Sequence, residues 1–228
     1  MNKKRAFFFN SVEPPEEKRE FFVKDVVRST AAAPTYFPPA VIKNLVTDEV
    51  MTNIDGGVFA NNPTMCAYAE CSNFEFPEVK NPRAQELLIL SIGTGGGRFD
   101  MPNLQKSSNW GVVDWAKLIP SIMMDGSIDT VDYQMKNLFG TLEAHHQFNY
   151  KRVDVPLAAR TYSTDMANAS KENINALKDA GKAALDAALL ETESQYGLDK
   201  FIQLLVDNGT EKNATNSVAK GSFSTVIS

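Results

Sequence analysis

Residues that commonly signal a metal or redox site are scarce in this sequence. It contains two histidines and two cysteines among 228 residues. Cys66 and Cys71 are too far apart for a Cys-x-x-Cys redox pair, and their spacing fits no zinc ligand set. We therefore expect both cysteines to be reduced, partly buried thiols.

Long apolar runs and an excess of positive charge are also absent. No stretch approaches the roughly 18 apolar residues that span a bilayer, and the apolar run after Lys3–Arg5 is too short for a signal peptide. The formal net charge of -5 has the wrong sign for a surface that follows phosphates. These absences predict a soluble, cytoplasmic protein with no transmembrane segment, no signal peptide and no nucleic-acid partner.

What is present is the composition of one globular domain, with 43% hydrophobic and 22% charged residues. The run Glu86–Ile92 is nearly all apolar, which is typical of a strand buried on both faces of a parallel sheet, so α/β is the predicted class. A shorter strand is expected over Val50–Ile54. It leads into the Asp-Gly-Gly of residues 55–57, and the Asn-Pro of residues 62–63 then predicts a helix start.

Periodicity predicts further elements along the chain. Helices are expected over residues 20–28, 109–142 and 170–193, and a strand over residues 149–155. Ser170 can cap the last of these helices. Its expected apolar stripe consists of Ile174, Leu177, Gly181, Ala184, Leu185 and Ala188.

Two segments differ in composition from the rest. Residues 109–124, with Trp110 and Trp115, are rich in aromatic, aliphatic and methionine side chains. Surfaces that dock on lipid have this composition. Few lysines or arginines accompany these side chains, however, which favours a helix packed in the core. Beyond Val206 the sequence turns polar. This change predicts a folded part over residues 1–206 and a disordered tail over residues 207–228.

Asp55 is the candidate for chemistry. A carboxylate at the carboxyl end of a strand can face a substrate cleft, and Gly56 and Gly57 permit positive backbone torsion and leave space around it. The alternative is a turn aspartate that bonds its own backbone, which an isolated Asp-Gly more often is. The wider pattern decides between them.

Four motifs occur in a fixed order: FFFN at residues 7–10, VRSTAAAPTYFP at 27–38, IDGGVFANNP at 54–63 and LSIGTG at 90–95. Together they resemble the second half of the patatin-like phospholipase family. A weaker match continues to about residue 190.

The resemblance implies a modified α/β-hydrolase fold, a parallel-sheet sandwich flanked by helices. It implies hydrolysis of acyl esters in membrane or micellar lipids, of the phospholipase or galactolipase type, without cofactor or metal. The family uses a Ser-Asp dyad, in which Asp55, with Gly56 and Gly57 completing its motif, would take the serine proton directly. Such a base must be ionised yet able to accept a proton.

The family's Gly-x-Ser-x-Gly elbow and glycine-rich oxyanion loop are not found in these 228 residues. Only Ser91 has a glycine two positions later, and its place in the apolar run predicts a structural role. We therefore expect a partial fold that lacks the nucleophile-bearing N-terminal half. It would associate with such a half or with itself. The alternative is an inactive lipid-binding or regulatory remnant.

Two further patterns are interpreted as structural. Gly93–Arg98 matches neither a dinucleotide-binding glycine motif nor a P-loop, which favours a flexible exit from the strand over an anion site. His145 and His146 are expected on a helix end or loop, because the Ser-Asp mechanism needs no histidine.

Overall fold

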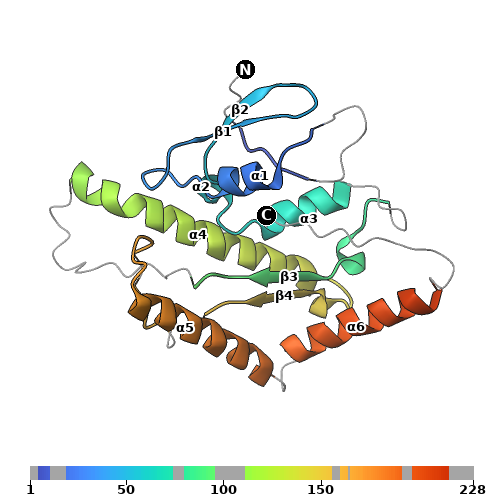
Figure 1. The fold of residues 1–228 in the computed structure, drawn as a ribbon. Helices are drawn as coiled ribbons and strands as arrows, with labels where there is room; N and C mark the ends of the chain where they lie inside the picture. The colour runs from blue at the N-terminus through green and yellow to red at the C-terminus, as the bar shows by residue number, and fades with distance from the viewer. Residues whose placement is uncertain are drawn as a thin grey trace.

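The computed structural model describes residues 5–10, 19–73, 80–95, 111–155, 160–163, 165–191 and 197–215. Helices are interspersed with four short strands in the described part of the chain (Figure 1). In order they are α1 (Val23–Thr30), β1 (Ala40–Lys43), β2 (Val50–Asn53), α2 (Gly57–Ala60), α3 (Thr64–Asn73), η2 (Ala84–Glu86), β3 (Ile89–Ile92), α4 (Val112–Gly140), η4 (Gln147–Asn149), β4 (Tyr150–Val153), α5 (Lys171–Leu190) and α6 (Leu198–Thr215).

The α/β class is confirmed, but the described strands form two separate two-stranded sheets. β3 and β4 are parallel, with Ile89 opposite Tyr150, as predicted for that region. β1 and β2 are antiparallel, so a single parallel sheet is not what these four strands form. The reason is local: Asn44 accepts the backbone N–H of Val46 and turns the chain after β1, and a connection this short permits only an antiparallel pair.

The main core lies between β3–β4 and the helices beside them. Met135 and Phe139 of α4 are 0% and 1% exposed, and they pack with Tyr150 at the start of β4. In Figure 1, α3 and α4 lie above the β3–β4 pair, while α5 and α6 lie below it. α4, α5 and α6 each contact β4, so this strand is the centre of the described fold.

The expectation that the Glu86–Ile92 run is buried on both faces is wrong. Ser91 is 5% exposed, but Leu90 and Ile92 are 42% and 73% exposed. Side chains alternate between the two faces of a strand, and the described elements cover only the face of Ser91. The apolar run therefore leaves one face of β3 uncovered in this part of the chain.

The core interpretation of residues 109–124 is also wrong for the part that the structure describes. The predicted helix is present as α4, but Val112 and Met123 are 86% and 66% exposed and Trp115 is 41% exposed. The buried contacts of α4 lie in its second half, around Met135. Trp110 lies outside the described residues. Among the described helices, none has the length and apolarity needed to cross a membrane.

The last two helices confirm one prediction and correct another. The Ser170 hydroxyl accepts the N–H of Asn173 and caps α5 as expected. The buried face of α5 is rotated from the predicted stripe: it consists of Asn173, Ala180, Ala184 and Ala188, whereas Ile174, Leu177 and Leu185 are exposed. α6 continues to Thr215, past residue 207, where the polar tail is expected to begin; residues 216–228 lie outside the described part.

Candidate functional site

Asp55 follows β2 directly and lies at the start of a tight turn into α2. Its N–H donates to the carbonyl of Ala32 at 3.0 Å, and its own carbonyl accepts the N–H of Val58 at 3.3 Å. The predicted place of Asp55, at the end of a strand just before a helix, is therefore confirmed. The first contact joins this turn to the segment that follows α1.

The carboxylate of Asp55 is half-buried and held on one side only. Its Oδ1 accepts the backbone N–H of Gly57 at 2.6 Å, and no other described residue donates a hydrogen bond to it. This is the turn geometry that an Asp-Gly sequence favours. It orients the carboxylate, and within the described residues no donor uses Oδ2, so the turn interpretation and the base interpretation are compatible.

The two glycines do not adopt the positive torsion that the sequence suggested. Gly56 has φ -64° and ψ -27°, and Gly57 begins α2. Gly57 is instead needed for space: a Cβ there would lie 2.9 Å from Asp55 Oδ1 and 3.2 Å from Asn61 Oδ1. A Cβ at Gly56 would meet only Thr30 Oγ1, at an ordinary 3.5 Å. The second glycine therefore makes room for the Asp55 carboxylate.

The loop that begins at Asp55 ends in a buried turn at Asn62, which is 2% exposed. The Asn62 Oδ1 accepts both the N–H of Thr64 at 3.2 Å and its hydroxyl at 2.6 Å. The Asn62 Nδ2 donates to the carbonyl of Ile128 in α4 at 3.4 Å. Asn62 thus satisfies the N–H of Thr64 in the manner of a cap, but α3 begins at Thr64, so the predicted start at Pro63 with Asn62 as the N-cap is one residue too early.

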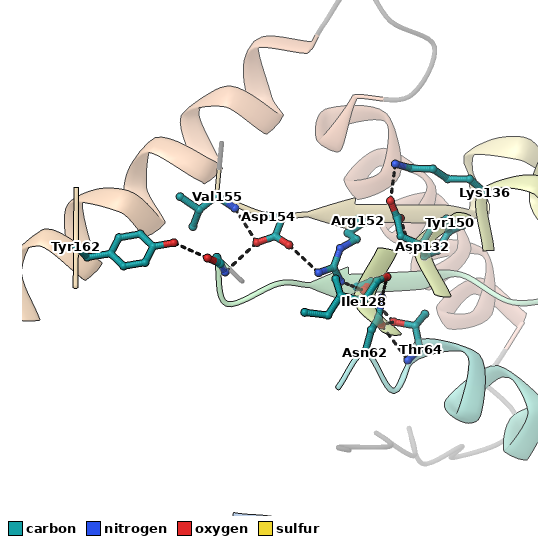
Figure 2. A network of polar contacts seen from close by, with 12 residues as sticks. Asn62, Thr64, Ile128, Asp132, Lys136, Tyr150, Arg152, Asp154, Val155 and Tyr162 are labelled. Carbon is teal, nitrogen blue, oxygen red and sulfur yellow. Dashed lines mark hydrogen bonds and ion pairs between the residues drawn. The ribbon is translucent and has the colours of Figure 1, made fainter. Parts of the chain in front are cut away.

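A buried polar network joins this turn to the β3–β4 pair (Figure 2). Ser91 Oγ lies 2.8 Å from Thr64 Oγ1 and accepts Nη1 of Arg152 at 2.8 Å. Arg152 Nη2 also donates to Asp154 Oδ2 at 2.7 Å. Ser91 is thus buried and fully engaged, which agrees with its predicted structural role. Sequence reasoning missed Arg152 and Asp154; their signal was two opposite charges at alternate positions where a strand ends.

The exit from β3 is held rather than flexible over Gly93–Gly95. Gly95 has φ +80°, its N–H donates to Asp154 Oδ1 at 2.9 Å, and its carbonyl accepts the hydroxyl of Tyr162 at 2.6 Å. A positive φ is the conformation that favours glycine. The remainder of the predicted glycine segment, residues 96–98, lies outside the described residues.

The histidines and cysteines lie away from Asp55 in sequence and have ordinary roles. His145 and His146 lie side by side in the turn after α4, as expected, with ring centroids 3.9 Å apart and ring planes tilted by 44°. Cys66 and Cys71 are unpaired on α3; burial, then the charge of Glu70, raises the pKa of both thiols. Within the described residues, no group of three or more His, Cys, Asp or Glu side chains could hold a metal ion.

Comparison with known proteins finds similarity to patatin-like proteins. A family model described as patatin-like phospholipase matches residues 1–68. Patatin-like protein 3 of Arabidopsis thaliana is 30% identical over 216 residues, which cover 87% of this chain and 48% of that protein. Patatin-like protein 1 of the same plant is 29% identical over 191 residues, covering 77% and 45%. A Solanum tuberosum protein named probable inactive patatin-3-Kuras 1 is 28% identical over 211 residues, covering 87% and 55%. The chain thus spans about half the length of the curated relatives it matches.

Proposed function

The chain belongs to the patatin-like phospholipase family, and from that premise we propose that it supplies the general base, Asp55, of a lipid acyl hydrolase. The observation that carries the proposal is the state of the carboxylate. One backbone N–H, from Gly57, orients Oδ1 at 2.6 Å, and no other described residue donates to this group. A general base needs this combination of fixed orientation and unused acceptor capacity.

The proposed reaction is acyl transfer through a Ser-Asp dyad. Asp55 accepts the hydroxyl proton of a serine as its oxygen attacks the ester carbonyl, and the proton then passes to the leaving alcohol. Water, deprotonated in the same way, releases the acyl group and regenerates the serine. The Gly57 N–H stays on Oδ1 throughout, so Asp55 needs no reorientation between the two halves of the cycle.

The serine in this proposal comes from a segment with a Gly-x-Ser-x-Gly elbow, which the 228 residues do not contain. Ser91 does not serve, because it is 5% exposed and engaged by Arg152 and Thr64. The partner is therefore a serine-bearing half of the same fold. The substrate class is an acyl ester of membrane or micellar lipid.

A second candidate is a lipid-binding or regulatory protein without turnover. One observation favours it: the similarity to a relative named probable inactive patatin. The two functions differ in one respect that can be measured. Only the first requires the Asp55 carboxylate.

The test combines this chain with the serine-bearing part of a relative and measures hydrolysis of a short-chain aryl ester and of phospholipid vesicles. We expect Asp55→Asn to lower turnover by at least about 10²-fold. The matched control is Asp48→Asn, because Asp48 is an exposed aspartate in the turn of the same hairpin and pairs with Lys43. Turnover by Asp55→Asn within a few-fold of the parent would remove Asp55 from the mechanism. Vesicle binding without turnover by the parent combination would favour the second candidate.

A further inference from the structure

A chain of buried hydrogen bonds runs from β4 to the loop that carries Asp55. Arg152 Nη1 donates to Ser91 Oγ at 2.8 Å, Ser91 Oγ lies 2.8 Å from Thr64 Oγ1, and Thr64 Oγ1 donates to Asn62 Oδ1 at 2.6 Å. Ser91, Thr64 and Asn62 are 5%, 8% and 2% exposed. The chain is therefore sealed from water at each of these three residues.

Chemistry fixes the direction of every bond in this chain. A guanidinium only donates, so Ser91 Oγ accepts from Arg152. The N–H of Thr64 bonds to Asn62 Oδ1, which makes that atom the amide oxygen, and the single hydroxyl proton of Thr64 is directed to it. Thr64 Oγ1 must then accept from Ser91. All three bonds point away from the positive charge of Arg152, and bonds aligned in this way strengthen one another.

The far end of the chain lies next to the Asp55 turn. Asn62 closes the loop of which α2 is the middle, and its Nδ2 holds that loop to Ile128 of α4. Its neighbour Asn61 places Oδ1 3.2 Å from the position that a Cβ on Gly57 would take, and Asp55 Oδ1 is 2.9 Å from the same point. The orientation of the Asp55 carboxylate therefore depends on a short turn that is anchored at Asn62.

We propose that Arg152 is a positioning residue for Asp55. Acting through Ser91 and Thr64, it fixes Asn62, and Asn62 fixes the α2 turn in which the Gly57 N–H orients the carboxylate. Asp154 neutralises the guanidinium from its other side, at 2.7 Å. Only the purpose of this positioning rests on the proposed function, because the coupling of Arg152 to the Gly57–Asp55 bond is a property of the folded chain alone.

The coupling is tested by amide hydrogen exchange and amide proton shifts on the full chain, with Arg152→Met, Arg152→Lys and Thr64→Val. We expect exchange at Gly57 and Thr64 to quicken at least about tenfold in Arg152→Met and in Thr64→Val. The shift of the Gly57 proton should move upfield as its bond to the carboxylate weakens. The double variant Arg152→Met with Thr64→Val should exchange no faster at Gly57 than either single variant. Arg152→Lys should restore part of the protection because it returns a buried donor.

The reference amide is that of Asn173, which bonds to the Ser170 hydroxyl at the start of α5 and should keep its exchange rate. Gly57 exchange and shift that match the parent in a folded Arg152→Met chain would overturn the proposal. If Arg152→Met does not fold, Ser91→Ala is the alternative variant. It interrupts the series of hydrogen bonds at its middle and keeps the Arg152–Asp154 pair. It should then give the same effect at Gly57, and parent-like values there would likewise overturn the coupling.

Turnover with a serine-bearing half separates this proposal from the proposed function. A fall in kcat with unchanged KM for Ser91→Ala agrees with mispositioning of the base. If Asp55→Asn has no effect on turnover while Gly57 exchange still responds to Arg152, the coupling stands and the general-base role of Asp55 is lost.

Discussion

Two aspartates in this chain each follow a strand, and they differ in the number of hydrogen bonds that their carboxylates accept. Asp154, after β4, accepts three hydrogen bonds: from Arg152 Nη2 at 2.7 Å, from the N–H of Gly95 at 2.9 Å and from the N–H of Val155 at 2.8 Å. Asp55, after β2, accepts one from Gly57 among the described residues. A carboxylate has about four lone-pair sites, so Asp154 is nearly saturated and Asp55 is not.

The difference shows what separates a structural carboxylate from a candidate base. Saturation ties the exits of β3 and β4 together, but it leaves little acceptor capacity for a further donor. A single well-placed donor fixes orientation without that cost. Position at a strand end is shared by both residues, so the number and kind of donors distinguish them.

The largest expected effect on stability comes from removing the Asp154 carboxylate. Asp154→Ala should lower the free energy of unfolding by about 3–5 kcal/mol, because it leaves the guanidinium of Arg152 buried without its carboxylate; that side chain is 9% exposed. Asp55→Asn should change it by only about 0.5 kcal/mol, since the amide oxygen can still accept the Gly57 N–H. Urea unfolding measures both. Equal losses would contradict the division of roles between the two aspartates.

The sequence predicted the local features on both sides of this comparison. Ser170 as a cap and the place of Asp55 between strand and helix depend on neighbouring residues, and both are found. Asn62 accepts the N–H of Thr64, but the helix begins one residue later than predicted. The partner of β2 was not predictable from an apolar pattern, because that pattern records burial and not pairing. The turn at Asn44, which dictates the antiparallel pair, would have been the local clue.

Arg152 and its partners show why the rest was missed. The bond between Arg152 and Ser91 joins residues 61 positions apart, and the bond between Asn62 and Ile128 joins residues 66 positions apart. No periodic pattern in the sequence indicates either bond, because each depends on how β3, β4 and α4 pack. The motifs therefore located the candidate base, and only the packing revealed what holds its loop.

A smaller effect is expected at the start of β4, where Tyr150 is 6% exposed and donates to Asp132 Oδ1 at 2.9 Å. Tyr150→Phe should cost about 1 kcal/mol at neutral pH, because Asp132 keeps its bond with Lys136. Burial, followed by the charge and hydrogen bond of Asp132, raises the pKa of Tyr150 above its ordinary range. The folded chain therefore retains a proton that the unfolded chain loses above about pH 10, so this stabilisation is full below that pH and declines above it.

Unfolding measured from pH 7 to pH 11 checks the sign of this effect. The difference in stability between the parent and Tyr150→Phe should shrink as the pH rises beyond about 10. A difference that grows with pH would mean that the tyrosine is ionised more readily in the fold, and that the polar contacts around β4 are not saturated as described.

The smallest effect on stability, and the sharpest on position, is expected from alanine at the two motif glycines. Gly56 is in the right-handed helical region and Gly57 begins α2, so alanine suits both backbones and can add up to about 1 kcal/mol of helix propensity. The two variants should therefore be about equally stable. At Gly57, however, the new Cβ would lie 2.9 Å from Asp55 Oδ1, and the side chain that yields is the carboxylate.

Gly57→Ala should accordingly displace the Asp55 carboxylate and weaken the 2.6 Å bond from the residue 57 N–H, whereas Gly56→Ala should preserve both. The amide proton shift of residue 57 reports the bond, and urea unfolding reports stability. With a serine-bearing half present, Gly57→Ala should lose more turnover than Gly56→Ala, because a base displaced by even about 1 Å can cost about 10²-fold in rate. Equal shifts and equal turnover would show that Gly57 does not set the carboxylate position. Loss of turnover at matched stability would separate the placement of the base from the folding of its loop.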